Sequence, residues 1–101
     1  MGEGITYKFK AKPYRYSPAE KNSWIFVSLP NEIAIEIREN FKRLEEGWGR
    51  MKITAIIGIS DWQTSIWFDT KQNTYLLPLK TKIRKEENIV LNKEVEITVI
   101  I

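Results

Sequence analysis

Residues 50–68, RMKITAIIGISDWQTSIWF, decide the fold of this chain. Apolar side chains occupy every second position from Met51 to Ile57, and mostly polar side chains lie between them. This period of two is typical of a strand with one buried face. A tight turn is predicted at 58–61, and an aromatic and β-branched run returns over 62–68. The stretch therefore predicts two strands joined by a turn.

The same kind of pattern recurs on both sides of this stretch. Further strands are predicted at four places: 5–11, 24–29, 75–79 and 95–101. Pro13 should bend or end the first of these strands, because a proline lacks the N–H that a sheet needs. The segment 14–16 would then continue that strand beyond the bend. Together with the central pair, the pattern predicts six strands.

Two segments have helical spacing instead. Apolar side chains recur at intervals of three or four from Ile33 to Leu44, which predicts an amphipathic helix over about residues 31–45. A second, short helix is expected over about residues 80–87, around Ile83. These two helices are the only ones that the pattern indicates.

The predicted elements define a fold class. Short strands have edges that must be covered, and closing the sheet covers them. We therefore expect a mainly β fold, a small closed or nearly closed six-stranded β-barrel with one principal helix and one short helix. The length of 101 residues fits a single domain over residues 1–101, and a hydrophobic content of 43% can supply its core.

Two of the tryptophans carry a further expectation. Trp62 and Trp67 are separated by an odd number of residues, so they should face opposite sides of one strand. One indole is expected in the core, and the other partly exposed or stacked across a strand pair.

The composition excludes several functions. The chain contains no Cys and no His. It therefore lacks the commonest general base and the usual zinc ligands, and no Ser lies in a nucleophile motif. We expect a non-enzymatic protein without a cofactor or metal. The absence of Cys, of a signal-peptide pattern and of a membrane-spanning run favours a cytoplasmic protein.

Five short motifs follow one another along the chain. They are Trp24 to Pro30, Gly47-Trp48-Gly49, Trp62 to Ile66, Tyr75 to Lys80 and Ile83-Arg84-Lys85. Together they resemble the "domain of unknown function" family nineteen-oh-five over nearly the whole chain. The resemblance implies a small β-barrel, distantly similar to swapped-hairpin barrels of the AbrB and MazE type. Members are sometimes fused to a YdeI/OmpD-associated domain, and the resemblance implies no activity.

The chain departs from this family at one turn. The family usually has Gly-Asp before the last strand, where this chain has Asn92-Lys93. Asn tolerates a left-handed backbone, so we expect the turn to be kept.

One of these motifs, extended by one residue to Gly47-Trp48-Gly49-Arg50, indicates a candidate ligand site. Trp48 offers an indole platform, and the Arg50 guanidinium can grip a carboxylate or phosphate. Arg84 would complete the site, with Lys80 assisting by charge. The other interpretation of this motif is a helix C-cap followed by a Trp that fills the core. The first hypothesis is a binding module for a small anionic ligand or a protein partner.

The alternative hypothesis is a nucleic-acid-binding domain of the swapped-hairpin kind. Lys8, Lys10 and Lys12 alternate along one strand face, and Arg15 and Lys52 would extend the basic surface. The other interpretation is a solvated face whose lysines protect a sheet edge. A net charge of +3 permits contact with nucleic acid without requiring it, and both a monomer and a homodimer remain open.

Overall fold

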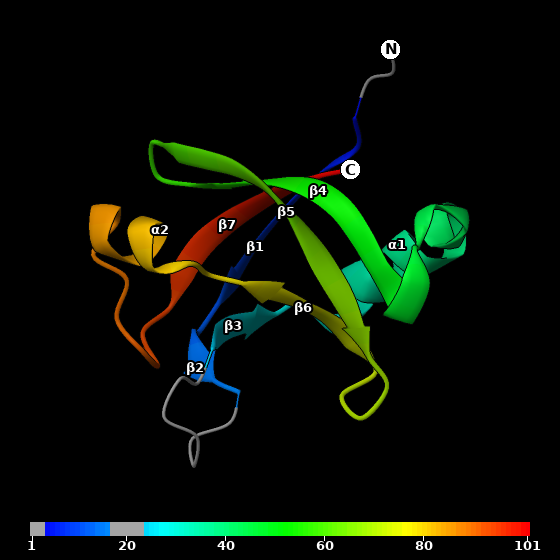
Figure 1. Cartoon of the computed structure of the whole chain (residues 1–101), viewed down its shortest axis with the longest axis horizontal. Coiled ribbons are helices and arrows are strands. Elements are labelled where there is room, and N and C mark those ends of the chain that lie inside the picture. Colours follow the sequence, from blue (N-terminus) through cyan, green and yellow to red (C-terminus); the bar gives the residue numbers. More distant parts are fainter. Residues whose placement is uncertain (1–3, 17–23) are drawn as a thin grey trace.

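A computed structural model describes residues 4–16 and 24–101, and of Trp48 it describes only the backbone. Seven antiparallel strands form one sheet in the order β1-β7-β4-β5-β6-β3-β2 (Figure 1). The strands are β1 (Thr6–Ala11), β2 (Tyr14–Arg15), β3 (Ile25–Ser28), β4 (Arg50–Ile57), β5 (Ser60–Asp69), β6 (Thr74–Pro78) and β7 (Val95–Ile100). The helices are α1 (Asn31–Phe41) and α2 (Thr81–Glu86), with short 3₁₀ helices η1 (Lys42–Leu44) and η2 (Gly47–Gly49). The mainly β prediction is confirmed.

The bend at Pro13 explains why there are seven strands and not six. After the bend, β2 leaves β1 and pairs with β3 at the far end of the sheet. The two edge strands are therefore neighbours in the sequence, and the bend links the two edges covalently. Asn92 donates its N–H to the Pro13 carbonyl at 2.8 Å and holds this corner. The sheet curls into a half-barrel, so the prediction of a nearly closed barrel is met by a curl with two linked edges (Figure 1).

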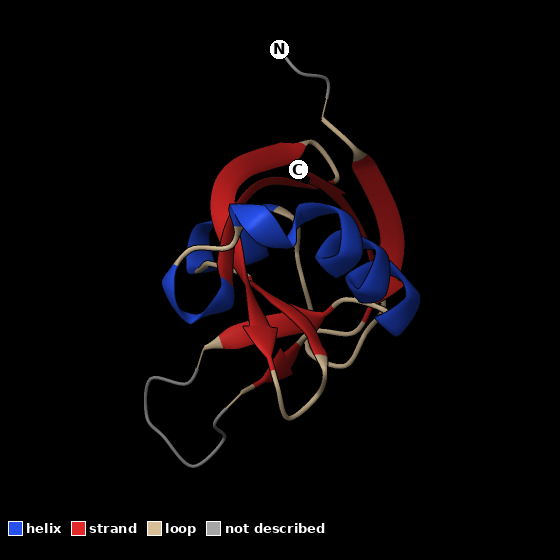
Figure 2. Ribbon diagram, turned by 90° about the vertical axis from the view of Figure 1, so that its right-hand side faces the viewer, coloured by secondary structure: helices blue, strands red, loops and turns tan. Residues whose placement is uncertain are grey.

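The helix α1 lies across the opening of the curled sheet (Figure 2). Ala34 and Ile37 are buried in the core that the inner face of the sheet forms. The predicted helix of 31–45 is α-helical only as far as Phe41 and then tightens into η1. This change of helix type alters the phase of the apolar stripe, so Leu44 is 47% exposed instead of packed. No helix among the described residues is long and apolar enough to cross a membrane.

The strands β4 and β5 form the longest ladder, from Arg50↔Trp67 to Ile57↔Ser60. Their turn contains only two residues, so Ser60 and Asp61, which the sequence places in the turn, belong to β5. Gly58 has a φ of 58° and begins the turn, as a hairpin with glycine in its first central position requires.

The two strand tryptophans face opposite sides of β5, as predicted. Trp62 is in the core and 8% exposed. Trp67 lies on the outer face, where its ring centroid is 5.5 Å from that of Phe26 and 5.7 Å from that of Trp24. Asn92 has a φ of 65°, so the left-handed turn before the last strand is also confirmed.

Candidate ligand-binding cleft

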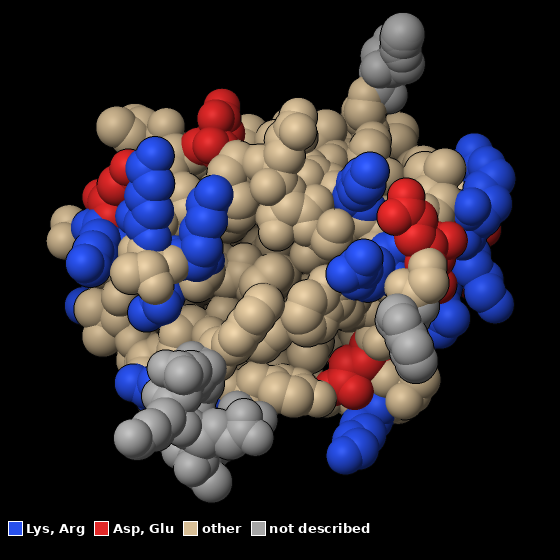
Figure 3. Space-filling view, in the orientation of Figure 1, with Lys and Arg blue, Asp and Glu red and all other residues tan. Residues whose placement is uncertain are grey.

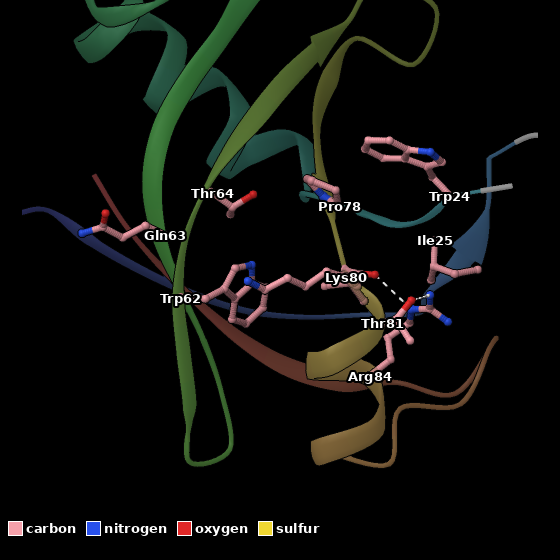
Figure 4. Close-up of a pocket in the computed structure, with 10 residues that line it drawn as sticks. Trp24, Ile25, Trp62, Gln63, Thr64, Pro78, Lys80, Thr81 and Arg84 are labelled. Atoms are coloured by element: carbon pink, nitrogen blue, oxygen red, sulfur yellow. Dashed lines mark hydrogen bonds between the residues drawn. The ribbon is translucent and has the colours of Figure 1, made fainter. Parts of the chain in front are cut away.

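The strands β5 and β6 are paired at one end only. Their ladder contains three pairs, from Asp69↔Thr74 to Trp67↔Leu76. Beyond the last pair the strands separate. A cleft of about 550 Å³ lies there between β5 and the segment that runs from Pro78 into α2 (Figure 4).

The direction of the backbone groups of β6 follows from its other neighbour, β3. Leu79 donates its N–H to the Ile25 carbonyl at 2.8 Å, and Leu29 donates its N–H to the Tyr75 carbonyl at 3.0 Å. Successive residues of an antiparallel strand direct these groups to alternate sides. The backbone N–H and C=O groups of Tyr75 and Leu79 point to β3. The backbone of Pro78, one residue before Leu79, therefore faces β5.

Pro78 therefore accounts for the end of the ladder. One more hydrogen-bonded step beyond Trp67↔Leu76 would place Pro78 opposite Ser65. A proline has no N–H to donate to the Ser65 carbonyl, so this step loses a bond. The sheet opens at that step.

The strand β5 presents unpaired backbone groups to the opening. In a two-residue hairpin the closing pair, here Ile57 and Ser60, exchanges both backbone hydrogen bonds. Alternate residues of β5 from Ser60 onward are therefore directed to β4. Gln63 and Ser65 lie between them and direct their N–H and C=O groups toward β6. Gln63 lines the cleft, and Ser65 lies at its closed end, between Gln63 and the last pair of the ladder. Within the described part of the chain, neither residue has a strand partner on that side.

The side chains that line the cleft are cationic and aromatic. Lys80 and Arg84 supply two positive charges, and no Asp or Glu is among the lining residues that the structure describes. Trp62 lies at the base of the cleft and Trp24, 58% exposed, at its border. Lys80 extends from the start of α2 toward Trp62 (Figure 4). In the space-filling view the hollow has Lys and Arg side chains on the border nearest α2 (Figure 3).

The guanidinium of Arg84 is held in place by its neighbours. Its Nε donates to the Leu79 carbonyl at 3.0 Å, and its Nη2 donates to the Thr81 hydroxyl at 2.9 Å (Figure 4). A side chain that is already positioned loses less conformational entropy when it binds. An anion in the cleft would therefore meet a prepared guanidinium.

The structure brings together only two of the residues that the sequence grouped with Trp48. Lys80 and Arg84 share the cleft. Arg50 lines a separate hollow of about 350 Å³, because it lies opposite Trp67 at the paired end of β5. The grouping of Arg50 with Lys80 and Arg84 in one site is thus corrected by the register. The side chain of Trp48 lies outside the described residues.

The basic residues of the alternative hypothesis are spread over the sheet. They are Lys8, Lys10, Lys12, Arg15 and Lys52, and all five are exposed. Lys8 and Lys10 lie on the edge strand β1, where Glu96 is directly opposite Lys10. Lys52 is on β4, two places further into the sheet, and Arg15 is on β2 at the opposite edge. No single strand face holds all five.

Two residues of the cleft were not assigned to a site by the sequence. Trp24 and Trp62 were recognised as strand tryptophans, but not as neighbours of Lys80 and Arg84. The signal that could have found them is Pro78. A proline directed at a neighbouring strand marks the place where pairing ends and the interior becomes accessible.

A polar cluster pins the opposite, paired end of the two strands. The Tyr75 hydroxyl donates to Glu45, and Arg38 Nε lies 3.4 Å from the same carboxylate oxygen. Arg38 also stacks over the Phe68 ring at 3.7 Å. Burial, the hydrogen bond to Glu45 and the charge of that carboxylate raise the pKa of Tyr75 above its usual value. None of these residues lines the cleft, so their role is in stability.

A similar contact ties α1 to the first strand. The Tyr7 hydroxyl donates a hydrogen bond to Glu36 at 3.2 Å. Burial is the larger cause, and this hydrogen bond the next, of a raised pKa at Tyr7. Among the residues that the structure describes, no group of three or more acidic, His or Cys side chains is arranged to hold a metal ion.

Comparison with known families agrees with this description. The family described as "Domain of unknown function (DUF1905)" matches residues 9–99. The chain belongs to this family, and the resemblance noted from the motifs is confirmed. No curated protein matches the chain.

Proposed function

We propose that this chain is a non-enzymatic binding module that takes a small anionic ligand in the cleft between β5 and β6. The observation that supports the proposal most is that Lys80 and Arg84 share a cleft in which none of the described lining residues is acidic. Two cations without a counter-charge attract an anion more strongly in a partly enclosed cleft than on an open surface.

The aromatic side chains favour a ligand with a planar or apolar part. Trp62 offers an indole at the base, and Trp24 offers a second one at the border. The volume of about 550 Å³ lies within the range of small-molecule sites, roughly 300–1,000 Å³. A carboxylate or phosphate attached to a flat or apolar group fits this lining.

The alternative, a nucleic-acid-binding domain, is less well supported. It needs Lys8, Lys10, Lys12, Arg15 and Lys52 to act together, and they are spread over β1, the bend that follows it, β2 and the central strand β4. The carboxylate of Glu96 opposite Lys10 also weakens the positive field of β1.

Titration of intrinsic Trp fluorescence with citrate and inorganic phosphate tests the proposal. We expect a saturable change that weakens about three- to tenfold in Lys80→Gln, which removes one charge contact worth about 1 kcal/mol. Lys85→Gln is the matched control, because Lys85 is an exposed lysine of α2, the helix that begins directly after Lys80, and does not line the cleft. No saturable change, or equal affinities in both variants, would contradict the proposal.

A second titration tests the alternative. Fluorescence anisotropy with random duplex and single-stranded DNA, at low and moderate salt, reports phosphate contacts through their salt dependence. Salt-sensitive binding that is lost in the double variant Lys8→Gln, Lys10→Gln but kept in Lys80→Gln would support the basic strand face instead.

A further inference from the structure

The edge of β5 at the cleft has unpaired backbone N–H and C=O groups, which a small anion would leave largely unused. Gln63, which lines the cleft, and Ser65, at its closed end, direct their backbone N–H and C=O groups toward β6, and the described residues offer them no strand partner there. Residues two apart on a strand repeat at about 6.8 Å, which is the spacing of the bonding groups on any other extended chain. An unpaired strand edge of this kind is a template for strand addition.

We propose that the ligand of the cleft is an extended acidic peptide segment that adds to β5 as a strand. This inference rests on the proposed function, because it uses the same cations and the same cleft. The backbone of the peptide would bond to Gln63 and Ser65.

The charges of the cleft select an acidic sequence. The register of β5 and β6, continued past its last pair, places Lys80 opposite Gln63. The cations therefore flank the part of β5 that has no partner. A glutamate or aspartate on the added strand would reach Lys80 and the positioned guanidinium of Arg84.

The two tryptophans select the alternate side chains. Successive side chains of a strand point to opposite faces. Trp62 belongs to the inner face of β5, and Trp24 lies at the outer border of the cleft. An apolar residue on the inner face of the added strand would contact Trp62, and acidic residues would take the alternate positions. The expected ligand alternates acidic and apolar residues.

Binding of a defined peptide tests the inference. The probe is fluorescein-labelled Val-Glu-Val-Asp-Val-Glu-amide, measured by anisotropy against the full chain. Two further peptides carry N-methyl groups on one or the other alternating set of backbone nitrogens. Because only alternate amides of an added strand face β5, we expect one methylated peptide to bind at least tenfold more weakly and the other within about threefold of the parent.

A variant of the protein tests the same contact from the other side. Ser65→Pro removes the N–H directed toward β6, whereas the bonds of β5 to β4 are made by its neighbours. We expect Ser65→Pro to lose peptide binding and Ser65→Ala, the matched control with its N–H intact, to keep it. Should Ser65→Pro not fold, hydrogen exchange of the native protein replaces it. The Gln63 and Ser65 amides should then become protected when the peptide is added.

The outcomes separate this inference from the proposed function. Binding of citrate or phosphate without binding of the peptide overturns strand addition and leaves the anion site standing. Equal binding of both methylated peptides overturns strand addition as well. Binding of neither the anions nor the peptide overturns both proposals.

Discussion

The two ends of the β5–β6 pair differ in everything that holds strands together. At one end three residue pairs form a ladder, and the Phe68 and Tyr75 rings meet edge to face at 5.2 Å. Arg38 and Glu45 add an ion pair beside these rings. At the other end Pro78 interrupts the ladder, and the described lining residues give the two cations there no acidic partner.

The strand β5 thus contributes to a packed, paired end and to an open cleft at its other end. The paired end closes the sheet beside α1 and its following turn, and there Glu45 accepts a hydrogen bond from Tyr75 and forms an ion pair with Arg38. The separated end leaves backbone groups and positive charges available to a ligand. Breaking the first end should cost stability, and closing the second should cost binding.

The largest effect is expected from Tyr75→Ala at the paired end. Tyr75 is fully buried, so its truncation should lower the free energy of unfolding by about 3–5 kcal/mol, as for other large aromatic residues. The change also leaves Glu45 without its phenol partner. Urea denaturation measures the loss, and a cost below about 1 kcal/mol would show that this end does not pin the strands.

Pro78→Val should close the separated end. The new N–H can bond to the Ser65 carbonyl, which would stabilise the protein by about 0.5–1.5 kcal/mol. The more flexible unfolded chain offsets this by about 0.4–1 kcal/mol, so little net change in stability is expected.

The affinity of Pro78→Val for citrate should instead fall about tenfold or more, equivalent to about 1.4 kcal/mol. Pro30→Val, at a proline that precedes α1 and does not line the cleft, is the control. Unchanged affinity for citrate in Pro78→Val would contradict the claim that Pro78 opens the cleft.

Alkaline pH should lower the free energy of unfolding, in part through Tyr75 at the paired end. The folded state raises the pKa of Tyr75, and the unfolded chain has the ordinary value of 10.0. Stability is therefore fully present below pH 10.0 and falls as the pH rises above it, by at most about 1.4 kcal/mol per pH unit for one group.

Urea denaturation one pH unit below and one unit above 10.0 measures this fall. The fall should be smaller in Tyr75→Phe than in the native protein, whereas Tyr16→Phe, at an exposed phenol, should not change it. An equal fall in all three proteins would assign the alkaline loss to other groups.

The smallest effect is expected from Gln63→Ala at the separated end. The Gln63 side chain is exposed, so the free energy of unfolding should change by less than about 0.5 kcal/mol. Binding of the peptide should persist, because the proposed contact uses the backbone of this residue. A large loss of stability would indicate that the cleft is packed and not open.

Local patterns predicted the elements of the fold well. The alternation from Met51 to Ile57 and the helical spacing after Ile33 each correspond to an element of the structure. The bend at Pro13 was predicted, but its consequence was not. That β2 pairs with β3 at the far edge depends on contacts distant in the sequence, which local periodicity does not encode.

The site was predicted only in part for the same reason. Lys80 and Arg84 were singled out by charge, and they share the cleft because α2 directly follows β6. The opening of the cleft depends on which strand Pro78 is directed to, and this follows from the pairing of β6 with β3. A register between strands far apart in the sequence decides that direction.

Amide hydrogen exchange in the free protein tests the account most directly. The measurement compares Gln63 and Ser65 with their neighbours Trp62 and Thr64, whose N–H groups are directed to β4. The account predicts that Gln63 and Ser65 exchange at least about tenfold faster than Trp62 and Thr64, because only the latter donate within the sheet. Equal, slow exchange at all four amides would show a continuous ladder from β5 to β6 and would contradict the open cleft.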